Sequence, residues 1–243
     1  MDVLNSYELR ARFAPAIVVV FPLGIIIYSI LSFTGQISNQ LSQFLTGGAI
    51  LLTLVYLFSF LVRHNGRKIE PELWSSWDGP PSTRIMRWRD TTIGEKTKSQ
   101  AYAAVKHICG ITLCSKAQEA EDEQLADNRI SEAFNLVKTY VRKNNPEGLW
   151  DKHNAEYGFH RNLIGSRKLW LTFSLIGMLV DGIIWFLYRD NNHLGFVMLN
   201  ALMLIGALVF GWFFLPKFAK ASAERYAESV WTMFLVAADS EKK

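Results

Sequence analysis

The chain has 243 residues, half of them hydrophobic, and a formal net charge of +4 at neutral pH. That length would suit one soluble domain, but the charged residues are crowded into a few stretches and long windows contain no charge, which argues against a wholly soluble fold. The two cysteines, Cys109 and Cys114, lie in the polar middle of the chain. The topology derived below predicts a reducing compartment there, and hence no structural disulfide.

Four apolar stretches set the predicted architecture. A helix needs about 20 apolar residues to cross the ~30 Å hydrocarbon layer of a bilayer, and each stretch has or nearly has that length. Only the third contains a charge, Asp181. The sequence therefore predicts an all-α integral membrane protein with four transmembrane helices in two hairpins, and an α-helical cytoplasmic domain between helices two and three. The predicted spans are 14–33, 47–62, 169–188 and 194–215.

The charges that flank these spans predict their orientation, because Lys and Arg in short loops stay in the cytoplasm. Loop 34–46 has no charge, and loop 189–193 has one basic and one acidic residue. Both termini and the middle are therefore expected inside. One pair of spans forming a buried hairpin in a soluble protein is the weaker alternative. The predicted parts are a hairpin over 1–63, a cytoplasmic domain over 64–168, a second hairpin over 169–215 and an amphipathic tail over 216–243. The cytoplasmic flanks carry Arg10, Arg12, Arg63, Arg67, Lys68, Arg161, Arg167, Lys168, Lys217, Lys220 and Arg225.

The polar middle has the periodicity of helices. Prolines and a glycine predict a loop over 69–81, and helical spacing of apolar residues predicts helices over 96–113 and 117–142. From about residue 151 the chain is expected to run as one helix into the third span. The tail 217–238 is amphipathic, so it either lies on the membrane or packs on the middle domain.

No catalytic motif supports an enzyme. The chain contains no nucleophile elbow, no phosphate-binding glycine loop and no zinc-protease motif. His107, Cys109 and Cys114 lack a fourth metal ligand and are expected in one amphipathic helix, so packing in a core is favoured over a metal site. We therefore expect no catalytic residue, no metal and no cofactor.

Two polar clusters of the middle are denser than folding requires. In the first, Arg84, Arg87 and Trp88 would share a helical face, and Arg89 follows them. Guanidinium groups beside an indole suit phosphates and stacked bases, so these four are candidate ligand-binding residues. A basic surface held together by Arg–acid pairs is the equal alternative. The second cluster, residues 154–163, adds the candidate Arg161, but a joint between helix and membrane is favoured there.

Inside the predicted spans, Asp181 and Asn200 are the polar residues whose role has to be explained. At 1.5 Å per residue they lie about 12 Å and about 9 Å from the same outer surface, so they are expected to meet between spans three and four. A hydrogen bond that pairs the helices, worth ~1 kcal/mol, is one role. A ring of carboxylates that lines a pore in an oligomer and favours cations is the other.

Three sequence runs carry a resemblance to a known family: Gly79 to Arg84, Arg87 to Asp90 and Glu156 to Leu163. With the two-plus-two spans, the chain resembles the four-span membrane effectors of bacterial anti-phage defence, in particular the Hailong effectors. The resemblance implies a homo-oligomeric channel in the bacterial inner membrane, with a tetramer favoured. It also implies control by an oligonucleotide such as single-stranded DNA, made by a nucleotidyltransferase encoded nearby, and depolarisation on opening. The resemblance does not indicate which residues of this chain would bind the ligand.

A non-conducting membrane scaffold, whose cytoplasmic domain recruits a soluble partner, is the alternative function. It predicts a stable membrane protein without current or toxicity. An enzyme that acts on a lipid or a peptide is the third and least favoured hypothesis.

Overall fold

The computed structural model describes residues 6–36, 40–145, 148–189 and 191–240. The structure is all-helical, with 88% helix and no strand among these residues. It divides into two compact units, which are described separately. The first unit comprises Met1–Glu70 and Gly158–Ala219, and the second comprises Pro71–Tyr157 and Lys220–Lys243. The helices, with π-helical turns written η, are α1 (Ser6–Glu8), η1 (Leu9–Phe13), α2 (Ala14–Phe33), α3 (Gln40–Ser76), α4 (Pro81–Arg84), α5 (Glu95–Ala104), η2 (Val105–Cys109), α6 (Lys116–Glu121), α7 (Glu123–Asn144), α8 (Leu149–Tyr188), α9 (Asn191–Val209), η3 (Phe210–Phe214) and α10 (Leu215–Ser240).

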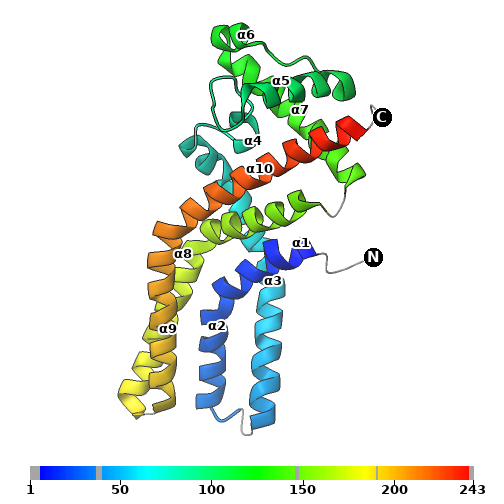
Figure 1. Ribbon diagram of the computed structural model, residues 1–243. Coiled ribbons are helices and arrows are strands. Elements are labelled where there is room, and N and C mark those ends of the chain that lie inside the picture. The colour runs from blue at the N-terminus through cyan, green and yellow to red at the C-terminus, as the bar shows by residue number, and fades with distance from the viewer. Residues whose placement is uncertain (1–5, 37–39, 146–147, 190, 241–243) are drawn as a thin grey trace. The chain divides into compact units, whose positions relative to one another are not determined.

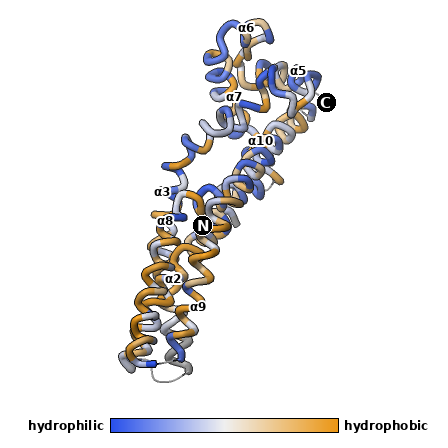
Figure 2. Tube along the Cα trace, turned by 90° about the vertical axis from the view of Figure 1, so that its left-hand side faces the viewer, coloured by the Kyte–Doolittle hydropathy of each residue, from blue (hydrophilic) through white to orange (hydrophobic). Residues whose placement is uncertain are grey.

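The first unit is built from long apolar helices. Helix α2 coincides with the predicted first span, and α8 ends at Tyr188, where the third span was predicted to end. Figure 1 shows the helices of this unit running side by side, and α2 contacts α9. Hydrophobic residues prevail along them (Figure 2). Four helical stretches of the described chain are long and apolar enough to cross a membrane: Leu9–Phe33, Leu45–Arg84, Leu149–Tyr188 and Asn191–Ser240.

Helix α3 is longer than the sequence predicted, and the predicted loop over 69–81 is wrong for residues 69–76. Pro71 lies inside the helix, although it lacks the N–H that would bond to the preceding turn. Burial of Leu73 on this stretch favours continuation of the helix. The helix ends where Asp78 and Gly79 take positive φ angles of 63° and 103°, and the Gly79 N–H bonds to the Trp74 carbonyl at 2.8 Å. Left-handed residues of this kind commonly end helices.

Helix α8 confirms the prediction that one helix runs from the polar middle into the third span, because it is continuous from Leu149 to Tyr188. The boundaries of the two compact units differ from the domain boundaries that were predicted from hydropathy. Residues 158–168, which the hydropathy prediction assigned to the middle domain, belong to the first unit. Helices α3, α8 and α10 each contribute residues to both units.

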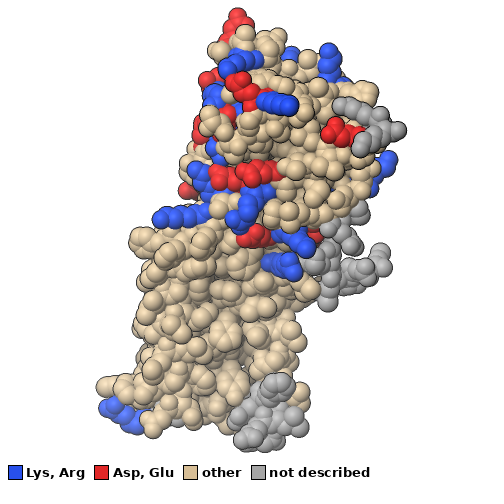
Figure 3. Space-filling model, viewed as in Figure 1, with Lys and Arg blue, Asp and Glu red and all other residues tan. Residues whose placement is uncertain are grey.

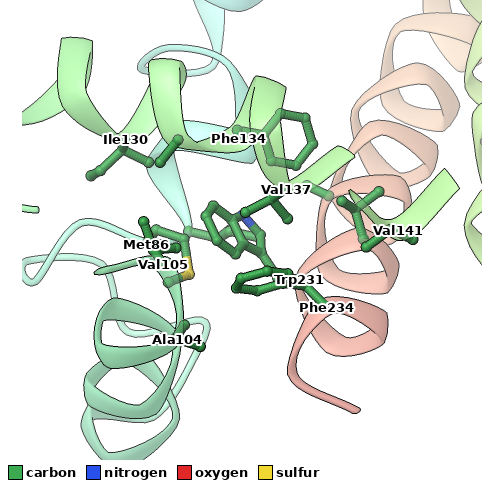
Figure 4. Close-up of a cluster of buried hydrophobic side chains, with 14 of the residues drawn as sticks. Met86, Ala104, Val105, Ile130, Phe134, Val137, Val141, Trp231 and Phe234 are labelled. Atoms are coloured by element: carbon green, nitrogen blue, oxygen red, sulfur yellow. The ribbon is translucent and has the colours of Figure 1, made fainter. Parts of the chain in front are cut away.

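The second unit has its own hydrophobic core, and the C-terminal tail is part of it. Trp231 and Phe234 of α10 pack against Val137 of α7 and Val105 of η2 (Figure 4). The indole N–H of Trp231 also donates to the Ser82 carbonyl at 3.0 Å. Of the two predicted roles for the tail, packing on the middle domain is the one observed.

Two predicted helices of this unit end or break earlier than expected. The helix predicted over 96–113 ends at Cys109, because Gly110 has a φ of 70° that stops it. Cys114 therefore lies outside the helix expected to contain it. The helix predicted over 117–142 is interrupted at Asp122, whose extended backbone and carboxylate cap α7 by accepting the Leu125 N–H at 2.9 Å. Asp is among the preferred N-cap residues.

Candidate functional site

The predicted arginine cluster lies in the second unit, on α4 and the turn that follows it. Two buried residues hold this turn. The Glu119 carboxylate accepts the backbone N–H groups of Trp88 at 2.9 Å and of Arg89 at 3.3 Å. From the other side, the Lys98 ammonium donates to the carbonyls of Arg87 and Asp90. The turn therefore has its donors and its acceptors satisfied by one acid and one base.

Lys98 and Glu119 were not among the predicted residues. Their side chains are 0% and 3% exposed, which is unusual for these residue types. Burial lowers the pKa of Lys98, and the nearby carboxylates of Asp90 and Glu119 only partly oppose it. A signal was present in the sequence, since Lys98 shares the inward face of its helix with Ala101 and Val105.

Arg87 is fully engaged within the protein. Its Nε and Nη2 atoms donate to the Asp127 carboxylate at 2.8 and 2.6 Å. Its Nη1 atom donates to the carbonyl and the carboxylate of Asp78 at 2.7 and 2.8 Å. Burial would lower the pKa of Arg87, but these carboxylates outweigh it and raise the pKa. Gly79 makes room for the guanidinium, because a Cβ there would lie 2.8 Å from Nη2. Arg87 therefore ties the turn after α4 to α7.

Trp88 is likewise part of the packing. Its indole N–H donates to the Cys114 carbonyl at 3.0 Å, and its ring lies 4.9 Å from the ring of Tyr102. The predicted stacking of a nucleic-acid base on this indole has no support from that arrangement. For Arg87 and Trp88, the geometry favours the alternative of a domain held together by internal contacts.

Arg84 and Arg89 are more accessible. Arg84 bonds to Asp90 at 2.9 Å and to Glu224 of α10 at 2.6 Å. Arg89 pairs with Glu123 at 2.8 Å, and its side chain is 38% exposed. Ion pairs as exposed as that of Arg89 contribute only about 0–1 kcal/mol. An anionic ligand can therefore compete for Arg89 at little loss.

A pocket of about 440 Å³ gathers these arginines. Lys220, near the start of α10, also lines the pocket. Nothing in the sequence connected this residue with the arginine cluster. The Lys220 side chain is exposed and forms no ion pair with any described residue. The pocket thus contains more basic than acidic groups, an arrangement that suits an anion. Its lining residues are Ser76, Trp77, Asp78, Arg84, Arg87, Arg89, Asp90 and Lys220.

No protein-family model, curated protein or solved structure matches the chain.

Arg161, the fifth predicted ligand residue, is not part of this pocket. It lies in the first unit, where it donates to Glu70 at 2.9 Å and to the Asn162 side-chain oxygen at 3.3 Å. The Asn162 amide in turn donates to the Ala11 carbonyl at 2.6 Å. The contacts connect α8 to α3 and η1, so this cluster joins three helices of the first unit. The predicted joint between helix and membrane stays a prediction.

Glycines let the helices of this joint approach closely. A Cβ at Gly66 of α3 would lie 2.7 Å from the Asn162 Cα, and one at Gly158 would lie 2.8 Å from the Ala11 Cβ. A Cβ at Gly165 would lie 2.6 Å from the Gly66 nitrogen. Real side chains do not fit at these distances. The second polar cluster therefore owes its composition to helix packing.

Asp181 and Asn200 meet, as the sequence predicted. The Asn200 amide of α9 donates to the Asp181 carboxylate of α8 at 3.2 Å, and both side chains are fully buried within the single chain. Gly177, one turn earlier on α8, leaves the space that the Asn200 amide fills, since a Cβ there would lie 2.6 Å from its atoms. This geometry supports the helix-pairing role.

Proposed function

We propose that the chain is a ligand-controlled, pore-forming membrane effector of bacterial anti-phage defence. In this proposal four spans in two hairpins cross the inner membrane, and both termini and the second unit lie in the cytoplasm. Subunits assemble into a homo-oligomer, with a tetramer favoured, because four helices are too few to enclose a roomy pore. An oligonucleotide bound on the cytoplasmic side controls the channel, and opening depolarises the cell.

Outward-facing apolar side chains support membrane insertion. Leu52 of α3 is 72% exposed and Phe213 of η3 is 70% exposed, and many large apolar neighbours on the same helices are also exposed. Soluble proteins rarely expose so large an apolar surface, which marks a membrane or protein interface. In Figure 3 the face of the first unit shown has few charged residues along its helices.

The observation that carries ligand control is the basic pocket of the second unit. Lys220 and Arg89 are its most accessible cations, and Arg84 lies beside them. Its volume is within the usual range of about 300–1,000 Å³ for small-ligand sites, which is enough for a nucleotide unit of a longer chain. The arginine guanidinium binds phosphate and carboxylate oxygens through paired hydrogen bonds, so phosphate groups suit this pocket.

Purified protein reconstituted in a planar bilayer tests the proposal. The current is measured with and without short single-stranded DNA, for the native chain and for Arg89→Ala combined with Lys220→Ala. We expect a current that responds to the oligonucleotide, and a response shifted at least tenfold in concentration in the double variant. Arg225→Ala is the matched control, because Arg225 pairs with Glu156 on the surface and does not line the pocket.

The non-conducting scaffold remains the second candidate, and one observation favours it. Asp181, the single acid of the predicted spans, is buried against Asn200 within its own subunit. A residue that lines a pore between subunits would be exposed in the isolated chain. A stable oligomer or monomer that carries no current under any ligand condition would favour the scaffold over the channel.

A further inference from the structure

We infer that Arg84 is the phosphate-binding arginine of the basic pocket, and that Glu224 of α10 is an internal competitor which an incoming phosphate displaces. The inference rests on the proposed function, because it concerns the same pocket, but it does not depend on the pore. Carboxylate and phosphate oxygens accept the same paired hydrogen bonds from a guanidinium group. A carboxylate of the chain itself can therefore occupy the position that a phosphate would take.

The first observation is that Arg84 has an incomplete set of partners. Its Nη1 atom donates to the Asp90 carboxylate at 2.9 Å, and its Nη2 atom donates to Glu224 Oε1 at 2.6 Å. Its Nε atom is buried and has no hydrogen-bond partner among the described residues. A buried donor without an acceptor is costly. An anion that reaches Nε and Nη2 together would remove that cost.

Arg87, three residues along the same turn, shows the arrangement that Arg84 lacks. Its Nε and Nη2 atoms donate to the two oxygens of the Asp127 carboxylate at 2.8 and 2.6 Å. This paired geometry is the one in which a guanidinium group binds a carboxylate or a phosphate most strongly. Glu224 contacts only the Nη2 atom of the corresponding edge of Arg84. That edge is therefore half-occupied, and a phosphate, which has several free oxygens, can fill it.

The second observation is that α10 brings an acid and a base to the pocket one turn apart. Glu224 follows Lys220 by four residues, so the two side chains lie on one face of the helix. Lys220 lines the pocket with Arg84 and forms no ion pair with any described residue. A phosphate in the pocket thus meets a second cation beside Arg84. The displaced Glu224 carboxylate returns to water, since its side chain is already 29% exposed.

The ion pair between Glu224 and Arg84 is not what holds α10 in the second unit. Trp231 and Phe234 of α10 are buried in the hydrophobic core (Figure 4). The Trp231 indole N–H also donates to the Ser82 carbonyl at 3.0 Å. Displacement of Glu224 therefore leaves this packing in place, and we expect Glu224→Gln to fold like the native chain.

Equilibrium binding to the full chain in a phosphate-free detergent tests the inference, with short single-stranded DNA and inorganic pyrophosphate as separate probes. Glu224→Gln should lower the Kd of both probes about three- to fivefold, because the competing ion pair is lost. Glu228→Gln is the matched control: Glu228 lies one turn further along α10, is exposed and does not contact Arg84. At about 0.15 M salt its charge is screened, so the Kd should change by less than about 1.5-fold.

Arg84→Lys is the second variant, since it keeps the positive charge but removes the paired donors. It should raise both Kd values about tenfold or more. If Arg84→Lys binds both probes as tightly as the native chain, Arg84 is not the phosphate-binding residue and the inference is wrong.

The sign of the Glu224→Gln effect separates a competitor from a structural residue. An unchanged or raised Kd overturns the inference, because the carboxylate would then stabilise the pocket instead of competing for it. Absence of binding by either probe, in the native chain and in Glu224→Gln, overturns it as well. Binding of pyrophosphate alone, tightened by Glu224→Gln, would support the inference and remove the oligonucleotide from the proposed function. A current controlled by DNA and insensitive to Glu224→Gln would support the proposed function and overturn the inference.

Discussion

The side chain of Asn162 donates a hydrogen bond to the one carbonyl that Pro15 leaves without its α-helical donor. In an α-helix the N–H of residue 15 would bond to the carbonyl of Ala11, but proline has no N–H. The chain forms the π-helical turn η1 here, in which Ala14 bonds to Leu9, and Asn162 supplies the missing donor from α8 at 2.6 Å. Buried backbone carbonyls are almost always satisfied.

Helix α8 also contacts a second π-helical turn that a proline follows, but at a different carbonyl. It contacts Gly211, whose α-helical donor would be the Leu215 N–H, rather than Trp212, whose donor would be the N–H that Pro216 lacks. In η3 the Leu215 N–H bonds to Phe210, and residue 216 is a proline. The Gly211 carbonyl accepts from the Arg167 guanidinium at 3.4 Å. Helix α8 thus provides a polar side chain at each of two proline-associated π-helical turns of the first unit. Such turns are rare and often mark functional positions in helices.

Replacing Asn162 with Ala should destabilise the first unit by about 1–3 kcal/mol, because a buried carbonyl loses its donor. Pro15→Ala supplies a backbone N–H for the same carbonyl. The loss from Asn162→Ala should therefore be smaller in a Pro15→Ala background, by about 1 kcal/mol. A double-mutant cycle of unfolding free energies in mixed micelles measures this coupling. Strict additivity of the two substitutions would show that Asn162 does not compensate for the proline.

Gly66→Ala should destabilise the helix joint by about 1–3 kcal/mol, in the range seen for overpacked cores. The new methyl group would lie 2.7 Å from the Asn162 Cα, and backbone cannot yield as a flexible side chain does. Gly48→Ala on the same helix is the control, since a Cβ there meets nothing within 4 Å. It should be neutral or slightly stabilising. Equal Tm values for the two variants would contradict the close packing of α3 on α8.

The sequence predicted the apolar helices well because absence of charge over about 20 residues is a local property. The meeting of Asp181 with Asn200 also followed from local facts, their depths along two consecutive helices. The arginine pocket did not follow from local features of the sequence. Arg87 finds its carboxylate on Asp127, and Arg84 reaches Glu224 near the C-terminus. Composition alone gives no sign of partners so far apart, so predicted ligand residues such as Arg87 and Trp88 proved to be engaged in packing.

The Asp90 carboxylate should contribute stability that depends on pH. Burial would raise its pKa, but the Thr92 hydroxyl and N–H and the charges of Arg84 and Lys98 outweigh burial and lower it. A lowered folded-state pKa means that the contribution is complete above the ordinary value of about 3.8 and is lost as the pH falls through the lowered value. The difference in Tm between the native chain and Asp90→Asn should therefore shrink from pH 6 to pH 3. A constant difference would indicate that Asp90 acts through its shape alone.

Lys98→Met should destabilise the second unit by about 2–4 kcal/mol, because two carbonyls of the turn lose their donor while the buried volume stays filled. The effect should reach the pocket, since the turn that Lys98 holds also carries Arg89. Lys116→Met is the matched control. Its ammonium pairs with Glu95 at 2.9 Å, but both side chains are more than two-thirds exposed, at 69% and 68%, so the loss should be much smaller than that of Lys98→Met. Chemical unfolding monitored by tryptophan fluorescence gives the two free energies. If Lys98→Met were as mild as Lys116→Met, the turn would be held by Glu119 and its own backbone, and the role assigned to the buried ammonium would be wrong.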